Sequence, residues 1–487
     1  MAIGVLDRSS DLGAQSLLAG ETAPVDASGA PILPSGPEPA PVDAFDEPAP
    51  ELAARRREGA VRHSLPRPAI GDCVALVALL VLLVEVCAGV LPDDPTLLLY
   101  FTPLRQVLGL GLVAAVLASA SHGSWGTALD LPAAVLALAA IPAARAAGDF
   151  SPWRWLVTYV AAYYLTVFVV RRVHDLRESL GLLGLGGVAI AAFAALTQAA
   201  TQEPTGMCRS LFTGSADCED PDTLVRVIGT FANPNTLGAF LVLAMPFAIA
   251  AALAAVRTTS RIISWGIVAA GGIALLFTFS RGPLVAVLFG VLAYLVLRRP
   301  EPRRLRGAGI VTAAGLGLFL LVTIVAPDAV GVRWDVWRAA IAQALRNPLG
   351  VGLQAGGGAI QDYIGDEGAE DYLHAHNLWL NMWLETGWLG LAASVAITVL
   401  AALMVIRLAR RGSTTAPIVG AALAGFAIAS VVDHSANTVR IAIALAVVLG
   451  VLAGEYGAPR SLRGTVRRPL EAVPPVPVRP ADTLLDD

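Results

Sequence analysis

Two histidines stand in a short stretch that is suited to proton transfer. His374 and His376 come directly before an aromatic segment that turns hydrophobic after Glu385. An imidazole titrates near neutral pH, so at a wet membrane surface it can accept the proton of a hydroxyl group. We therefore predict that His376 or His374 is a general base; the alternative is a histidine that caps the next helix or bonds the backbone. A zinc site needs a third protein ligand, and the predicted outer loops offer no further His or Cys cluster except His434, so we expect no metal site.

Two arginines precede predicted helices and could bind an anion. Arg226 lies in a loop before a helix that we expect to begin at Pro234, with Asn233 as its N-cap. Ser280 is expected to cap another helix, which puts Arg281 in the first turn, where the helix dipole disfavours a cation. A bound anion such as phosphate would relieve that conflict. The alternatives are an ordinary surface arginine or one that snorkels to the membrane interface.

Large apolar side chains recur at helical spacing further along the chain, at Trp334, Trp337, Ile341 and Leu345. The spacing predicts an amphipathic helix that lies on the membrane. Arg333 and Arg338 flank the stripe and are further candidates for anion binding. The glycine-rich segments that follow can adapt to a ligand, but they match no phosphate-binding loop of nucleotide enzymes, and we expect no nucleic-acid partner.

The elements that hold these residues are predicted to be membrane spans. The chain has 487 residues, of which 56% are hydrophobic and 15% charged, and its apolar runs are long enough to cross a bilayer. This excludes a soluble enzyme and predicts an all-α, polytopic membrane protein with about twelve transmembrane helices. The spans are expected near 71–91, 98–120, 128–144, 153–170, 179–200, 235–256, 261–279, 282–298, 307–326, 384–406, 415–432 and 438–456.

Arginines concentrate in segments on one side of these spans, which predicts that both termini are cytoplasmic. We expect a disordered cytoplasmic tail at 1–69, a transmembrane domain at 70–457 and a second cytoplasmic tail at 458–487. The first span would then be an uncleaved signal anchor. The only large extracytoplasmic loop, about 327–384, joins the ninth and tenth spans.

Two other features lie in predicted outer loops. Cys208 and Cys218 share one loop, where either a local disulfide or two free thiols would fit. The last outer turn carries a polar patch that we rank as supporting only, since helix capping explains its Asn and Asp. Its members are Asp433, His434, Asn437 and Arg440.

Four motifs, in this order, resemble those of the O-antigen ligase and O-antigen polymerase superfamily of bacterial inner-membrane glycan-transfer proteins. They cover about residues 220–395. They are Arg226 with Gly229-Thr-Phe-Ala-Asn-Pro-Asn, Ser280-Arg281-Gly282, the segment from Arg333 and Arg338 to Pro348-Leu-Gly-Val-Gly, and His376-Asn377 with Glu385-Thr-Gly-Trp-Leu-Gly.

The resemblance implies transfer of a glycan from undecaprenyl diphosphate to an acceptor on the outer face of the membrane, without nucleotide sugar, cofactor or metal. It implies that Arg226 and Arg281 hold the diphosphate and that His376 activates the acceptor hydroxyl. The acceptor could be a glycan, a lipid or a wall polymer. A single displacement assisted by a base would invert the anomeric centre.

Two other functions stay open at this point. A polysaccharide polymerase would share the same motifs and differ only in its acceptor. A solute or lipid-linked glycan transporter is the alternative from another class, since many polytopic proteins of this size are carriers. Carriers usually place ionisable groups at mid-membrane, whereas here Glu85 is the clearest charge within a span and polar residues gather in loops.

Overall fold

The computed structural model describes most of the chain between Ile70 and Gly457. All the described residues belong to one compact unit, Pro68–Asp487. The tails predicted at 1–69 and 458–487 lie outside the described residues. The ranges described are 70–89, 103–119, 125–172, 176–203, 205, 207–210, 214–216, 218, 223–325, 333–365 and 374–457.

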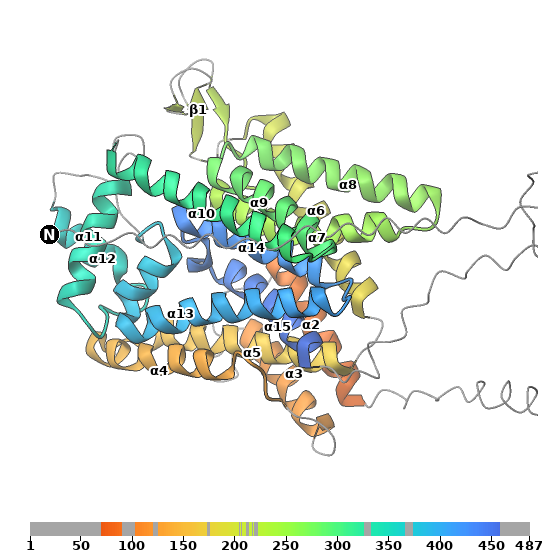
Figure 1. The fold of residues 1–487 in the computed structure, drawn as a ribbon, viewed down its shortest axis with the longest axis horizontal. Coiled ribbons are helices and arrows are strands. Elements are labelled where there is room, and N and C mark those ends of the chain that lie inside the picture. Colours follow the sequence, from red (N-terminus) through yellow and green to blue (C-terminus); the bar gives the residue numbers. More distant parts are fainter. Residues whose placement is uncertain are drawn as a thin grey trace, which may run out of the picture. The chain divides into compact units, whose positions relative to one another are not determined.

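The described part of the chain is almost entirely helical (Figure 1). Each of the twelve predicted spans coincides with a helix. These are α2 (Ile70–Ala88), α3 (Pro103–Ser119), α4 (Asp130–Ala147), α5 (Ser151–Arg172), α6 (Leu176–Thr201), α7 (Pro234–Ala254), α8 (Thr258–Phe277), α9 (Arg281–Arg298), α10 (Pro302–Val325), α13 (Leu378–Arg410), α14 (Ala416–Val432) and α15 (Val439–Gly457).

Eight of these helices, namely α2, α5 to α9, α13 and α15, are long and apolar enough to cross a membrane. The chain is therefore a polytopic all-α protein, as predicted. The number of twelve spans and the placement of the loops stay predictions. A helix such as α14, with 17 residues, reaches only about 26 Å, a little short of a bilayer core of about 30 Å.

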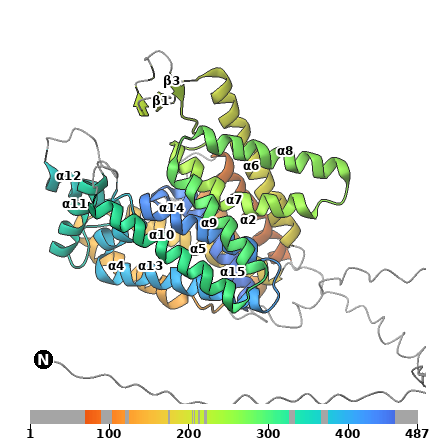
Figure 2. The ribbon, with the colours of Figure 1, turned by 45° about the horizontal axis from the view of Figure 1, so that its top comes forward.

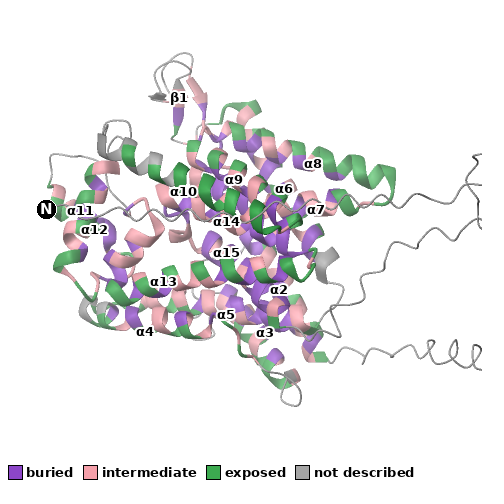
Figure 3. Ribbon diagram, viewed as in Figure 1, coloured by how far each residue is buried: buried purple, intermediate pink, exposed green. Residues whose placement is uncertain are grey.

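The helices differ in how far the protein encloses them (Figure 3). Most of α15 and more than half of α7 are buried, whereas only 28% of α8 and of α9 is buried. Large apolar side chains of α8, including Ile262, Ile263 and Leu276, are exposed. An apolar exposed face of this kind suits contact with lipid rather than water.

Helices α11 (Arg333–Arg346) and α12 (Gly356–Ile364) lie together near the start of α13 (Figures 1 and 2). The amphipathic helix predicted around Trp334 is therefore present. The face that packs on the protein is a different one from the stripe predicted to lie on the membrane: Val336, Ala339, Ala340 and Ala344 are buried, while Ile341 and Leu345 are exposed. Small side chains allow the close approach to the neighbouring helices, and the larger ones are left on the outside.

A sharp break divides α13 near its start. Gly387 has φ +70° and ψ −166°, so residues 378–386 form a short segment before the long apolar part of the helix. The turn at 347–352 fills the break: the amides of Val351 and Gly352 donate to the carbonyls of Leu384 and Glu385 at 2.9 and 3.1 Å. This turn fixes the segment that begins directly after the two candidate histidines.

A small antiparallel sheet follows α6. Strands β1 (Cys208–Ser210), β2 (Gly214–Ala216) and β3 (Thr223–Val225) pair in the order β2-β1-β3. A disulfide joins Cys208 to Cys218, so of the two states left open by the sequence the structure has the bonded one. In both ribbon views the sheet stands beyond the end of α6 (Figures 1 and 2).

Candidate functional site

Arg226 is held against the turn between α8 and α9. Its Nε donates to the carbonyl of Thr278 at 3.0 Å, and its terminal nitrogen donates to the hydroxyl of Ser280 at 3.2 Å. The Ser280 hydroxyl in turn donates to Asn235 Oδ1 at 2.7 Å. Ser280 is the N-cap residue of α9, but its side chain makes no capping bond, so the predicted capping role is wrong. It links Arg226 to α7 instead.

The loop between Arg226 and α7 is fixed by hydrogen bonds. Gln198 of α6 accepts from the amides of Ile228 and Gly229 at 3.0 and 2.9 Å. Asn233 caps α7 by accepting from the Thr236 amide at 2.8 Å, with Pro234 in the first turn, as predicted. Arg226 therefore extends from a fixed backbone.

Three helix ends meet beside Arg226. Asn377, the N-cap of α13, donates its side-chain amide to the carbonyl of Val431 at 2.8 Å. At the start of α9, a Cβ on Gly282 would lie 3.0 Å from Val432. The starts of α9 and α13 and the end of α14 are thus adjacent, and Asp433 follows α14 at this point.

Both candidate histidines contact Asp433. His376 Nδ1 lies 3.5 Å and His374 Nε2 lies 3.9 Å from its Oδ1 atom. The His376 amide donates to His374 Nδ1 at 3.1 Å, and the two rings lie 4.4 Å apart. His376 has φ +47°, an uncommon conformation for a residue with a side chain, and such outliers concentrate at functional sites.

Asp433 is the residue that the sequence ranked too low. It was expected to cap a helix, yet its carboxylate faces the two imidazoles and accepts from the amide of His434 at 2.8 Å. His434, a member of the predicted polar patch, is buried, and its ring lies 5.8 Å from that of His374. Within the described residues, the donor atoms of His374, His376 and Asp433 all lie within 4.8 Å of one another, a spacing that could hold a metal ion.

The cluster has unusual proton affinities. Burial, reinforced by the charges of His376 and Arg333, lowers the pKa of His374 to about 4. Burial and the charge of His374 lower the pKa of His434 to about 3. Burial raises the pKa of Asp433, but its contact with His376 and the charge of His374 more than offset this and lower it to about 2. At neutral pH the carboxylate is therefore charged, and the imidazoles of His374 and His434 are neutral.

Arg333, the first residue of α11, belongs to the same neighbourhood. Its charge contributes to the lowered pKa of Arg226, after burial and Arg209, and also to that of His374. Its Nε is buried without a hydrogen-bond partner. No described carboxylate forms an ion pair with Arg226 or Arg333, so these two guanidinium groups are available for an anion.

No described contact joins the other two predicted arginines, Arg281 and Arg338, to the histidine cluster. Arg281 is exposed at the first position of α9, between Ser280, which holds Arg226, and Gly282, which packs on α14. Arg338 is exposed on α11 and lies about 140° around the helix from Arg333, so the two side chains leave in different directions. No described contact brings Arg338 to the histidines.

Arg440, from the supporting patch, has a structural position. Its guanidinium donates to the carbonyls of Val86 and Thr230 and lies 4.1 Å from the Phe231 ring centroid. It thereby ties the end of α2 to the loop before α7. We assign it no role with a ligand.

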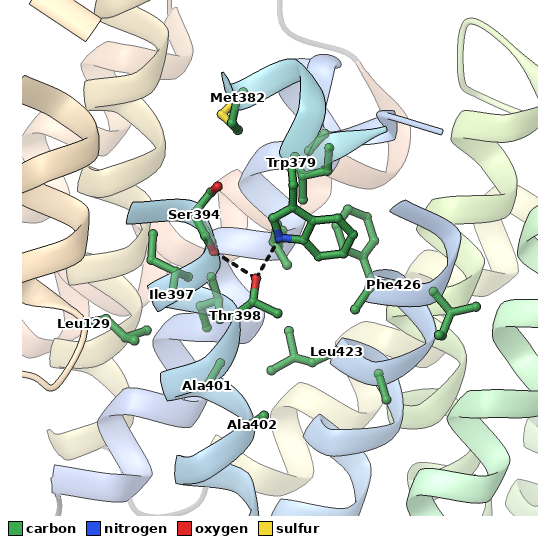
Figure 4. Close-up of a pocket in the computed structure, with 18 of the residues that line it drawn as sticks. Leu129, Trp379, Met382, Ser394, Ile397, Thr398, Ala401, Ala402, Leu423 and Phe426 are labelled. Carbon is green, nitrogen blue, oxygen red and sulfur yellow. Dashed lines mark hydrogen bonds between the residues drawn. The ribbon is translucent and has the colours of Figure 1, made fainter. Parts of the chain in front are cut away.

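A cavity of about 810 Å³ lies between helices that include α5, α9, α13, α14 and α15. Its walls are mainly aliphatic and aromatic, and its sparse polar contacts include Trp379 Nε1 donating to Thr398 Oγ1 at 3.3 Å (Figure 4). His434, Asn437 and Glu385 line part of it. The apolar cavity therefore reaches His434, the residue next to Asp433.

The chain was compared with known proteins and with protein-family models. No curated protein matches the chain. Residues 265–395 match the family model described as O-antigen ligase. The matched range contains Arg281, Arg333, His374 and His376, while Arg226 and Asp433 lie outside it. This match places residues 265–395 of the chain in the O-antigen ligase superfamily.

Proposed function

We propose that the protein transfers a glycan from undecaprenyl diphosphate to a hydroxyl acceptor on the outer face of the bacterial cytoplasmic membrane. The observation that carries this proposal is the meeting of Arg226 and Arg333 with the His374, His376 and Asp433 cluster at one end of the helices. A family of membrane glycan-transfer proteins of the ligase and polymerase type supplies the reaction class.

The arginines act on the leaving group in this proposal. When the bond between the sugar and the diphosphate breaks, negative charge grows on the departing phosphate. Guanidinium groups that are already desolvated and fixed stabilise that charge without reorganising. Arg226 meets this condition because its hydrogen bonds to the turn hold it in place. Arg281 directly follows Ser280 in the sequence, and Arg333 is near enough for its charge to act on Arg226.

His376 is the residue that we assign as the base. His374 is less suited, because its Nδ1 already accepts from the His376 amide. His376 is more open, with 27% of its side chain exposed against 14% for His374, and it lies nearer the Asp433 carboxylate. The neighbouring carboxylate can hold the His376 ring in position while it takes the proton of the attacking hydroxyl. Direct attack by that hydroxyl inverts the anomeric centre.

The cavity is suited to the lipid part of the donor. A polyprenyl chain is apolar, and the cavity is lined mainly by aliphatic and aromatic side chains of helices that include α13 and α14. Because the cavity reaches His434, a chain bound there would bring its diphosphate toward Asp433 and the arginines. The disulfide between Cys208 and Cys218 supports an extracytoplasmic position for this end, since such bonds are rare in the cytosol.

The same cavity keeps a transporter as the second candidate. A volume of about 810 Å³ between spanning helices could also hold a solute in transit. In cells, a transferase with His376→Ala would accumulate the lipid-linked precursor and leave its acceptor unmodified. Unaltered glycan with impaired solute uptake would favour the carrier instead.

Reconstitution tests the proposed reaction. Purified protein in vesicles is given a glycan on undecaprenyl diphosphate and a panel of acceptors, and the product is measured with and without a chelator. We expect His376→Ala and Arg281→Ala each to lower the rate on the order of a hundredfold. Arg298→Ala, at the opposite end of α9, is the matched control and should leave the rate unchanged.

The chelator should also have no effect, because the proposed reaction needs no metal. A product of retained anomeric configuration would rule out direct attack. Loss of activity on chelation would assign His374, His376 and Asp433 to a metal ion instead of to a base. The length of the product distinguishes a ligase from a polymerase: single transfers to a foreign acceptor indicate a ligase, and growth of the donor glycan indicates a polymerase.

A further inference from the structure

The small disulfide-closed sheet brings a further arginine to the site. Arg209 lies in the middle of β1 and pairs across the sheet with Leu224 of β3. The ladder continues one step further, since the amide of Arg226 donates to the carbonyl of Met207 at 2.9 Å. Leu224 and Arg226 are two residues apart, so Arg226 lies on the same side of the strand as Leu224 and is the diagonal neighbour of Arg209.

The Arg209 side chain is directed toward the turn that holds Arg226. Its guanidinium carbon lies 5.7 Å from the ring centroid of Phe279. Phe279 stands between Thr278 and Ser280, the two residues that accept hydrogen bonds from Arg226. The backbone of Phe279 has φ +50°, so this ring is presented by an uncommon turn conformation.

The electrostatic interaction between Arg209 and Arg226 also indicates that the two guanidinium groups are close. After burial, Arg209 is the largest influence that lowers the pKa of Arg226, ahead of Arg333. Two like charges so close cost free energy unless an anion lies between them. Among the described residues no carboxylate forms an ion pair with Arg209, and its side chain is half-exposed.

We propose that Arg209 binds the diphosphate of the lipid-linked donor together with Arg226, and that the Cys208–Cys218 disulfide holds it in position to do so. This assignment rests on the proposed function. Cys208 is buried beside Arg209 in β1 and lies opposite Val225, the residue before Arg226. The disulfide joins β1 to Cys218, which lies between β2 and β3 in the sequence, and so closes the small sheet on which Arg209 lies beside Arg226.

Direct binding of undecaprenyl diphosphate without a glycan, measured on the purified full-length protein, tests the assignment. Arg209→Met keeps an apolar side chain on Phe279 but removes the charge, and we expect its Kd to rise about tenfold. Arg209→Lys keeps the charge and should lie closer to the wild type. Arg298→Met, far from the sheet, is the control for loss of an arginine and should bind as the wild type does.

The role of the disulfide follows from combining variants. Cys208→Ala with Cys218→Ala should weaken binding by a similar factor, and adding Arg209→Met should cost little more, since both changes remove the same contact. Melting temperatures identify any variant that has lost its fold. If the wild type binds and Arg209→Met binds equally well, this inference is wrong while the proposed function stands. If the wild type does not bind the lipid diphosphate, the proposed function itself fails.

Discussion

Asp433 supplies the negative charge of the histidine cluster. It is the only carboxylate in contact with His374 and His376 among the described residues, and it also accepts from the His434 amide. The low pKa of Asp433 keeps a negative charge at the site across the physiological range. In the proposed reaction this carboxylate holds the His376 ring in place as the acceptor hydroxyl attacks.

The lowered pKa values predict a loss of stability in acid. Unfolded His374 and His434 titrate near 6.5, whereas the folded values are about 4 and about 3. Between these limits the unfolded chain binds more protons, so the stability is fully present above pH 6.5 and falls as the pH drops toward 4. Asp433, with a folded pKa of about 2 against 3.8, adds a further loss at still lower pH.

Melting temperatures in detergent between pH 7.5 and pH 4.5 measure this effect. We expect the wild type to lose stability steadily over that range. His434→Gln removes one of the two buried imidazoles and should give a shallower slope, whatever its stability at pH 7.5. Equal slopes for the two proteins would show that His434 is not held neutral by the fold.

Local sequence signals predicted some of these residues but not their partners. Asn233 followed by Pro234 defines the start of α7 by short-range rules, and the structure agrees. The role of Ser280 could not be found in this way, because Arg226 and Asn235 compete successfully for its hydroxyl from distant parts of the chain. Asp433 was underrated for the same reason: its contacts with His374 and His376 exist only after α13 and α14 have packed.

The break in α13 is the element that sets the position of the histidines. Gly350 and Gly387 pack backbone against backbone: a Cβ on either residue would lie 2.3 Å from a carbonyl oxygen of the facing segment. Both residues also have positive φ, at +88° and +70°. The turn at 347–352 and the start of α13 therefore behave as one unit, and that unit presents His376 to Asp433.

A glycine substitution tests this coupling. Gly387→Ala should lower the melting temperature and abolish transfer, because its Cβ would overlap the carbonyl of Pro348 and its φ is unfavourable for alanine. Gly358→Ala in α12 is the matched control, since a Cβ there meets nothing within 4 Å. Helix propensity favours that change, so stability should be equal or slightly higher. Full activity in Gly387→Ala would show that the break in α13 is not needed to position the histidines.

Hydropathy was sufficient to find the helices but not their buried faces. Every predicted span has a helix, because an apolar run of that length has few other stable states in a membrane. The large apolar stripe of α11 did not indicate which face of this helix packs against the rest of the protein. The structure buries the alanines at 339, 340 and 344, whose small size permits close helix packing.

The arrangement of the whole molecule separates the site from the opposite helix ends. Arg226 bonds the turn that ends α8, and α7 begins close by, so both helices have one end at the site. Arg257 lies in the connection at their other ends. Helices of 21 and 20 residues span about 30 Å, the thickness of a bilayer core, so Arg257 should lie across the membrane from the site.

Cysteine labelling in intact cells measures which side the site occupies. In a Cys73→Ala background, the exposed positions Asp362 in α12 and Arg257 are each changed to cysteine. We expect a membrane-impermeant maleimide to label Asp362→Cys in intact cells and to label Arg257→Cys only after permeabilisation, because arginines favour the cytoplasmic side. The reverse pattern would put the histidines and arginines in the cytoplasm, where a disulfide between Cys208 and Cys218 would not persist. Transfer to an outer-face acceptor would then be impossible for this chain.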